Sequence, residues 1–332
     1  MRILKFLAIY CIVGTAMAGT ITLSSERHSA LLYPMWCQGF YSCGQATYFV
    51  INGSRPSQEP LQLLEWKVDQ VLSIFQSTPR EDLYDAYSLA MTPDCHQLFM
   101  GSYNGGLTYR FDLSGDFKRL SIDGALSEQL FFYQNRLVRS SRKGKPILKP
   151  LNGEPLTGLS AISQVLAQDK RHPVEDHNNF NRTVLTVSGD RMAICYSMYD
   201  RIRVFNLKTG ALEQTIPIGR PFPSYQPPPP DYPVKRGQDY RHRVMTWNSS
   251  FHSLQSLRFR AGQVFGLFRK GFDTQGVWVA FDQANSFYWD NDKEQTKLLD
   301  IQEKRYFLAT VNGLEEEEVL WTLWDSLTLP GR

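Results

Sequence analysis

Two histidines and two carboxylates lie close together in the segment 163–182, and their types could hold a metal ion. His172 and His177 flank Glu175 and Asp176 in the sequence HPVEDHNNFNR. Imidazole and carboxylate ligands suit zinc and similar ions. Four residues between the histidines is not a standard ligand spacing, so a solvated polar loop is the favoured interpretation. We therefore expect no cofactor and keep His172 and His177 as weak metal candidates.

Four cysteines follow the first 18 residues, and cysteine chemistry depends on the compartment. Cys37 and Cys43 lie in MWCQGFYSCGQ, close enough in sequence to close a small ring around Gly39, and we predict a disulfide between them. Cys95 is expected in a turn and Cys195 in a strand, so a bond between these two is less favoured. Neither the number nor the spacing of the cysteines indicates a zinc site.

A proline-rich segment offers a second kind of candidate site. The sequence PFPSYQPPPPDYP at 221–233 cannot supply the backbone donors of a sheet and predicts an extended polyproline loop at the surface. Such a segment loses little entropy on docking. We predict that 163–182 and 221–233 line a contact surface with Tyr225 and Tyr232 as exposed anchors. A solvent-exposed linker is the alternative.

The elements that must position these residues repeat along the chain. An aromatic residue followed by a polar one ends a predicted strand at Trp66, Phe111, Phe205, Phe281 and Trp324, with 45 residues between the first two and 43 between the last two. A strand-rich period of about 40–50 residues is typical of a β-propeller, in which each blade is a four-stranded sheet. The segments 87–120 and 184–216 also share three turns in the same order. An ordinary β-sandwich with regular hairpins is the alternative.

The two segments resemble blades of the WD40-like and YncE-like β-propeller superfamily. The carrying residues are RVFNLKTG at 203–210 and, less closely, YRFDLSG at 109–115. The Gly-His pair of the strict WD40 repeat is missing, which indicates a diverged propeller. Propeller hydrolases of this kind hold calcium in the central tunnel. The resemblance would imply Asn104, Asp190 and Asp200 as ligands, although turn residues are the simpler interpretation.

Strand clusters predict an all-β chain with six blades, and seven remain possible. The clusters are 47–75, 87–120, 128–157, 184–218, 253–290 and 305–328. We assign one propeller domain to 47–329, with inserted loops at 163–182 and 221–233, and an N-terminal segment at 19–46. Residues 61–75 would also suit a helix, but Trp66 falls at the repeat position and favours strands. The N- and C-terminal strands should meet in one blade, because closure removes open sheet edges.

The first 18 residues predict export. Arg2 and Lys5 precede an apolar run from Phe6 to Val13, and Ala16-Met17-Ala18 provides a small-residue cleavage site. The run is too short to span a bilayer comfortably, so we expect a periplasmic or extracellular protein that is not transmembrane. Removing this segment lowers the net charge from +3 to about +1. A chain this close to neutrality does not indicate nucleic-acid binding.

Two functional classes follow from these features. The first is an exported binding module for another protein or a cell-surface component. The second is a metal-assisted hydrolase or lactonase. The sequence contains no G-x-S-x-G elbow and no C-x-x-C-H haem motif. Because no convergent set of acid, base and metal ligands is visible, we expect binding rather than catalysis.

Overall fold

The structure, a computed structural model, describes most of the strands and the turns that join them. The described residues are 20–24, 37–51, 61–67, 70–76, 86–102, 108–113, 117–120, 127–141, 148–151, 153–168, 183–196, 200–222, 246, 250–270, 276–281, 287–290, 296–315, 318–326 and 329.

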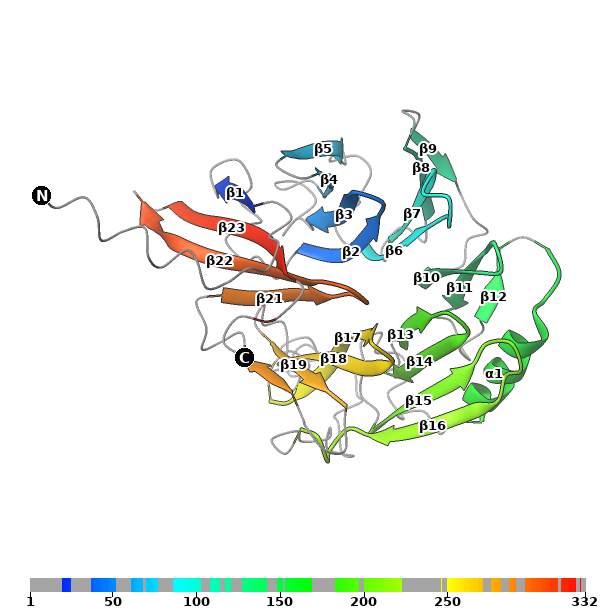
Figure 1. Cartoon of the computed structure of the whole chain (residues 1–332). Helices are drawn as coiled ribbons and strands as arrows, with labels where there is room; N and C mark the ends of the chain where they lie inside the picture. Colours follow the sequence, from blue (N-terminus) through cyan, green and yellow to red (C-terminus); the bar gives the residue numbers. More distant parts are fainter. Residues whose placement is uncertain are drawn as a thin grey trace, which may run out of the picture.

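Six antiparallel sheets are arranged around a common centre in chain order (Figure 1). The first two are β2 (Cys37–Cys43), β3 (Ala46–Ile51), β4 (Gln62–Lys67) and β5 (Gln70–Gln76), then β6 (Ala86–Met91), β7 (Gln97–Ser102), β8 (Thr108–Asp112) and β9 (Phe117–Leu120). The third has three strands, β10 (Ser127–Tyr133), β11 (Arg136–Ser141) and β12 (Leu148–Pro150). The fourth contains β13 (Thr183–Ser188), β14 (Arg191–Tyr196), β15 (Arg201–Asn206) and β16 (Leu212–Pro217). The fifth contains β17 (His252–Arg260), β18 (Gln263–Lys270), β19 (Val277–Ala280) and β20 (Tyr288–Asp290). The last contains β21 (Thr296–Ile301), β22 (Tyr306–Glu315), β23 (Glu318–Ser326) and β1 (Thr20–Ser24).

The sheets form a closed propeller. The first strands of successive sheets, β2, β6, β10, β13, β17 and β21, contact one another in this order, and β21 contacts β2. The outer strand of the last sheet comes from the N-terminus, since β1 pairs with β23 and Thr20 lies opposite Trp324. The predictions of an all-β propeller and of terminal strands in one blade are confirmed.

The number of regular blades differs from the count made on the sequence. Six blades were predicted, with seven as the alternative, and this count is wrong: five sheets are full four-stranded blades, and the sheet β10–β12 has three strands. The described residues form no seventh sheet. The boundary at residue 47 is also wrong, because β1 and β2 lie within 19–46 and both belong to propeller sheets. The strand interpretation of residues 61–75 is confirmed by β4 and β5.

The aromatic signature marks the third strand of each four-stranded sheet. Trp66 lies in β4, Phe111 in β8 and Phe205 in β15, and each side chain is buried. Phe281 follows β19 directly, and Trp324 lies in β23. The third strand has neighbours on both edges and packs between adjacent sheets, so the large rings of Trp66, Phe111, Phe205 and Phe281 are buried there.

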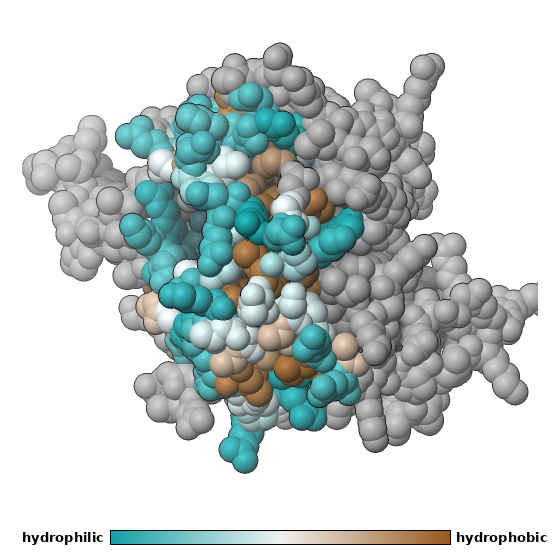
Figure 2. Space-filling model, turned by 90° about the vertical axis from the view of Figure 1, so that its right-hand side faces the viewer, coloured by the Kyte–Doolittle hydropathy of each residue, from teal (hydrophilic) through white to brown (hydrophobic). Residues whose placement is uncertain are grey.

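A helix takes the place of a fourth strand beside β12. The helix α1 (Thr157–Ala167) buries Leu159, Ile162 and Leu166 between the sheet β10–β12 and the sheet β13–β16. The backbone N–H of Leu148 in β12 donates to Ser163 Oγ of α1 at 3.0 Å, so the helix covers this sheet edge. Figure 2 shows the side of the molecule on which α1 lies, where hydrophilic residues border the apolar ones.

The helix corrects the interpretation of 163–182 as one loop. Residues 163–167 belong to α1, and 169–182 lie outside the described residues. The signal was present in the sequence, because Leu159, Ile162 and Leu166 recur at helical spacing. Gly158 permits the helix to approach the next sheet, since a Cβ there would overlap the carbonyl oxygen of Leu207. In the described part of the chain, no helix is long and apolar enough to cross a bilayer.

Candidate functional site

The centre of the propeller contains a cavity of about 710 Å³, which we call the central cavity. Residues of all six first strands line it. This volume lies in the range of small-molecule sites, which are concave and combine apolar walls with a few polar groups. The strands position those groups because each first strand is the inner edge of its sheet, so consecutive residues of it border the centre.

One wall of the cavity is held by an ion pair between two sheets. Arg258 of β17 donates from Nε and Nη2 to the two carboxylate oxygens of Asp300 in β21, at 2.6 and 3.0 Å. Arg258 Nη1 also donates to the carbonyl oxygen of Leu257 at 2.8 Å. The Asp300 side chain is 2% exposed. The bidentate geometry fixes the spacing of the two strands and neutralises the guanidinium.

The same carboxylate reaches a third strand. The backbone N–H of Phe40 in β2 and that of Ile301 both donate to Asp300. Burial raises the pKa of Asp300 above its ordinary value, while Arg258 and these N–H groups act in the opposite direction. Gln302 Nε2 donates to the carbonyl oxygen of Phe40 at 2.6 Å. The strands β17, β21 and β2 are therefore tied together, and we call this the tied wall.

A second tie joins β6 to β10. The hydroxyl of Ser88 donates to the carbonyl oxygen of Leu130 at 3.2 Å and accepts from the Leu130 backbone N–H at 2.8 Å. Ser88 and Leu130 are buried. One hydroxyl thus satisfies both backbone groups of a residue on the neighbouring sheet.

A second set of lining groups is uncommitted among the described residues, and we call it the open wall. It consists of half-buried, uncharged side chains with no side-chain hydrogen bond to another described residue: Gln129 of β10, Thr186 and Ser188 of β13, and Ser256 of β17. The phenol of Tyr41 in β2 also lines the cavity without a described hydrogen bond. Burial raises the pKa of Tyr41, which keeps this phenol neutral and able to donate. These groups are available to a ligand.

Carboxylates lie at the end of the cavity formed by the turns after the first strands. Asp190 follows β13 and accepts a hydrogen bond from Tyr133 at 3.0 Å. Burial and this hydrogen bond raise the pKa of Tyr133. Glu303 follows β21 and accepts from the backbone N–H of Ala261 at 3.1 Å. With Asp300, Arg258 and Arg269, the lining carries three carboxylates and two guanidiniums.

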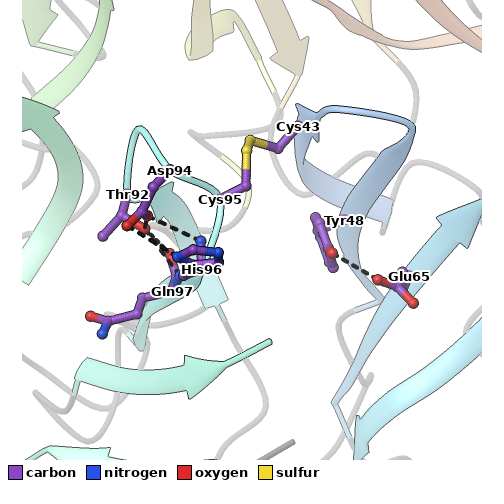
Figure 3. Close-up of a disulfide and its surroundings, with 8 residues drawn as sticks. All are labelled: Cys43, Tyr48, Glu65, Thr92, Asp94, Cys95, His96 and Gln97. Carbon is purple, nitrogen blue, oxygen red and sulfur yellow. Dashed lines mark hydrogen bonds and ion pairs between the residues drawn. A yellow bond between two sulfur atoms is a disulfide. The ribbon is translucent and has the colours of Figure 1, made fainter. Parts of the chain in front are cut away.

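The disulfide joins two sheets and not two ends of one strand. Cys43 at the end of β2 is bonded to Cys95, which lies in the turn between β6 and β7, with 6.0 Å between the Cα atoms (Figure 3). The predicted bond between Cys37 and Cys43 is wrong. Both residues lie in β2, where six extended steps of about 3.3 Å place them far beyond the reach of a disulfide. Cys195 is buried outside any disulfide, and its thiol donates to the carbonyl oxygen of Tyr196 at 2.8 Å.

Of the candidate site residues predicted from the sequence, few belong to the described part of the chain, and fewer line the central cavity. Asp190 lines the cavity, but Asp200 is exposed beside Arg201 at 2.9 Å and is not part of the lining. Asn104, His172, His177, Tyr225 and Tyr232 lie outside the described residues. Within the described ranges, no group of three or more His, Cys, Asp or Glu could hold a metal ion.

Sequence reasoning missed the groups that line the cavity. Thr186, Ser188 and Ser256 are ordinary strand residues, and no motif distinguishes them. A usable signal was their place in the first strand of a repeat, because the first strands of a propeller surround its axis. That signal required the strand order of each blade and not only the repeat length.

Comparisons with known proteins give likeness of fold only. No family model matches the chain, and no curated protein matches it. A virginiamycin B lyase from Staphylococcus aureus has 10% identity over 86% of this chain and 80% of that chain, with a TM-score of 0.44. A DUF4221 family member from Bacteroides vulgatus has 9% identity over 87% and 92%, with a TM-score of 0.47. The Cps50 (Swd1) β-propeller domain of Myceliophteria thermophila has 14% identity over 86% and 97%, with a TM-score of 0.41. None of these scores reaches 0.5, so the assignment to the β-propellers rests on the strand pairing of the chain itself.

Proposed function

We propose that the protein is an exported β-propeller that binds a ligand in its central cavity. The observation that carries the proposal is the open wall, where uncharged polar side chains lie half-buried around a cavity of about 710 Å³ without described partners. Small-molecule sites combine a concavity with a few polar groups that orient the ligand, and a half-buried uncommitted set in a cavity fits that arrangement.

Export is supported by two independent features. The N-terminal residues have the basic, apolar and small-residue order of a signal peptide. The Cys43–Cys95 disulfide is the kind of bond that persists in oxidising compartments outside the cytosol. Secretion with processing after Ala18 is the expected outcome, and N-terminal sequencing of the exported protein checks it.

A second part of the proposal concerns a macromolecular partner. We propose that a protein or cell-surface component is met by the parts of 163–182 and 221–233 that follow α1 and the buried Phe222, with Tyr225 and Tyr232 as anchors. Deletion of residues 224–231 should leave the melting temperature unchanged and weaken partner capture. A loss of folding would instead make the segment structural.

A thermal-shift screen of small molecules tests binding in the cavity. A ligand at 100 times its Kd stabilises the folded state by about 2.7 kcal/mol, which raises the melting temperature by several degrees. Thr186→Tyr places a bulky ring at the open wall, where it narrows the cavity, and should abolish the shift. Thr215→Tyr makes the same change on the exposed outer strand β16 and should retain it. Equal shifts in both variants, or none in the wild type, would contradict the proposal.

A further inference from the structure

We infer that the ligand of the central cavity is an uncharged, hydroxyl-rich molecule, namely a neutral saccharide. This inference rests on the proposed binding function and adds the chemical class of the ligand. It follows from three properties of the lining: the type of its uncommitted groups, the distribution of its charges, and its aromatic content.

The uncommitted groups both donate and accept hydrogen bonds. Thr186, Ser188 and Ser256 contribute hydroxyls, and Gln129 contributes an amide. A hydroxyl has one donor and two acceptor sites, and an amide has two donors and an acceptor. A ligand hydroxyl has the same dual character and can satisfy such a group in either direction. A carboxylate or phosphate ligand accepts only, so it would use the donors of this set and leave its acceptor sites unused.

The charges of the lining do not favour an anion. The Arg258 guanidinium is neutralised by Asp300 through two hydrogen bonds. Asp190 and Glu303 lie at the turn end of the cavity, and with Asp300 they outnumber the two guanidiniums. An anion entering from this end would be repelled by both carboxylates. A neutral ligand meets no such barrier.

Aromatic side chains complete the lining. Tyr41 of β2 and Phe132 of β10 are half-buried and line the cavity. Phe132 is held by Phe99, with ring centroids 5.5 Å apart. A fixed ring presents a flat apolar surface with a negative face. The C–H faces of a sugar ring match such a surface, while its hydroxyls reach the polar groups around it.

Calorimetric titration of the full mature chain tests the ligand class. The probes are glucose, N-acetylglucosamine, maltose and cellobiose, with glucuronate, glucose 6-phosphate and glycylglycine as the charged and peptide comparisons. At least one neutral sugar should bind in the wild type, and its anionic counterpart should bind at least tenfold more weakly.

Conservative variants locate the site. Thr186→Val keeps the side-chain shape and removes the hydroxyl, so the sugar should bind about tenfold more weakly. Thr186→Ser should restore binding, and Thr215→Val on the exposed face of β16 should match the wild type. Unaltered binding in Thr186→Val would overturn the inference.

The outcomes separate this inference from the proposed function. If only the anions or the dipeptide bind, and Thr186→Tyr abolishes that binding, the cavity binds ligands but the saccharide class is wrong. If no probe binds and the thermal-shift screen finds no compound that depends on Thr186, both the inference and the proposed function are wrong.

Discussion

The tied wall and the open wall of the central cavity share one architecture but use their polar groups differently. The tied wall has side chains that form hydrogen bonds to neighbouring strands, namely Arg258, Asp300 and Gln302. In the open wall, the hydroxyls of Thr186 and Ser188 form no hydrogen bond to a described residue. The comparison teaches that closing the ring does not require polar ties between every pair of sheets. Where apolar packing alone holds two sheets together, the polar side chains of the first strands can bind a ligand.

Breaking the ion pair should give the largest effect. Arg258→Met leaves Asp300 buried without its counter-charge, and we expect a loss of about 3–5 kcal/mol of unfolding free energy in urea denaturation. The double variant Arg258→Met with Asp300→Leu removes the buried charge and should be more stable than the single variant. If the double variant is less stable than the single one, the pair does not act as a unit.

The pH dependence of the Arg258→Met variant sharpens this result. The folded-state pKa of Asp300 is raised above 3.8 by burial, and the loss of Arg258 raises it further. A raised carboxyl pKa means that the folded state binds the proton more tightly. The stabilisation is fully present below the unfolded pKa and is lost as the pH rises through the folded pKa. The variant should regain stability, relative to wild type, as denaturation is repeated from pH 8 down to pH 5.

Removing the disulfide tests the tie between the first two sheets. Cys43→Ser with Cys95→Ser frees a loop with a sequence separation of 52 and should cost about 2–4 kcal/mol. Reduction of the wild-type protein should lower the melting temperature as much as the double substitution does. Cys37→Ser is the matched control and should leave it unchanged; an equal loss in that variant would point to a role for Cys37 in the fold.

Truncating the Ser88 hydroxyl should have a smaller effect. Ser88→Ala leaves the backbone N–H and carbonyl of Leu130 without this partner, which costs about 1–3 kcal/mol when both are buried. Thermal denaturation monitored by circular dichroism measures the loss. A change below 0.5 kcal/mol would show that water replaces the hydroxyl.

Changes in the open wall should have the smallest effect on stability. Thr186→Val with Ser188→Ala removes hydroxyls that bond to no described residue, so unfolding free energy should change by less than about 0.5 kcal/mol. Ligand binding should fall in the same variant. A loss of unfolding free energy as large as that of Ser88→Ala would show that the open-wall hydroxyls also stabilise the fold, which contradicts the distinction between the two walls.

The propeller architecture could be predicted from the sequence more completely than the cavity site. Trp66, Phe111 and Phe205 predicted the propeller because each is a large ring buried on the third strand of its sheet. The disulfide was missed because spacing along the chain says little about partners on neighbouring sheets, as Cys43 and Cys95 show. The cavity was missed for a related reason. Thr186 and Ser256 become neighbours of one space only after the ring closes, and nothing local distinguishes them from other strand residues.

The pairing of β1 with β23 also orders events during folding. The segment Thr20–Ser24 is synthesised some 300 residues before its partner Glu318–Ser326. This contact closes a loop of some 300 residues. Such non-local closures are slow because the chain loses conformational entropy before stabilising contacts form. The last sheet keeps an exposed edge until then. The ring is therefore completed only when β23 becomes available to pair with β1.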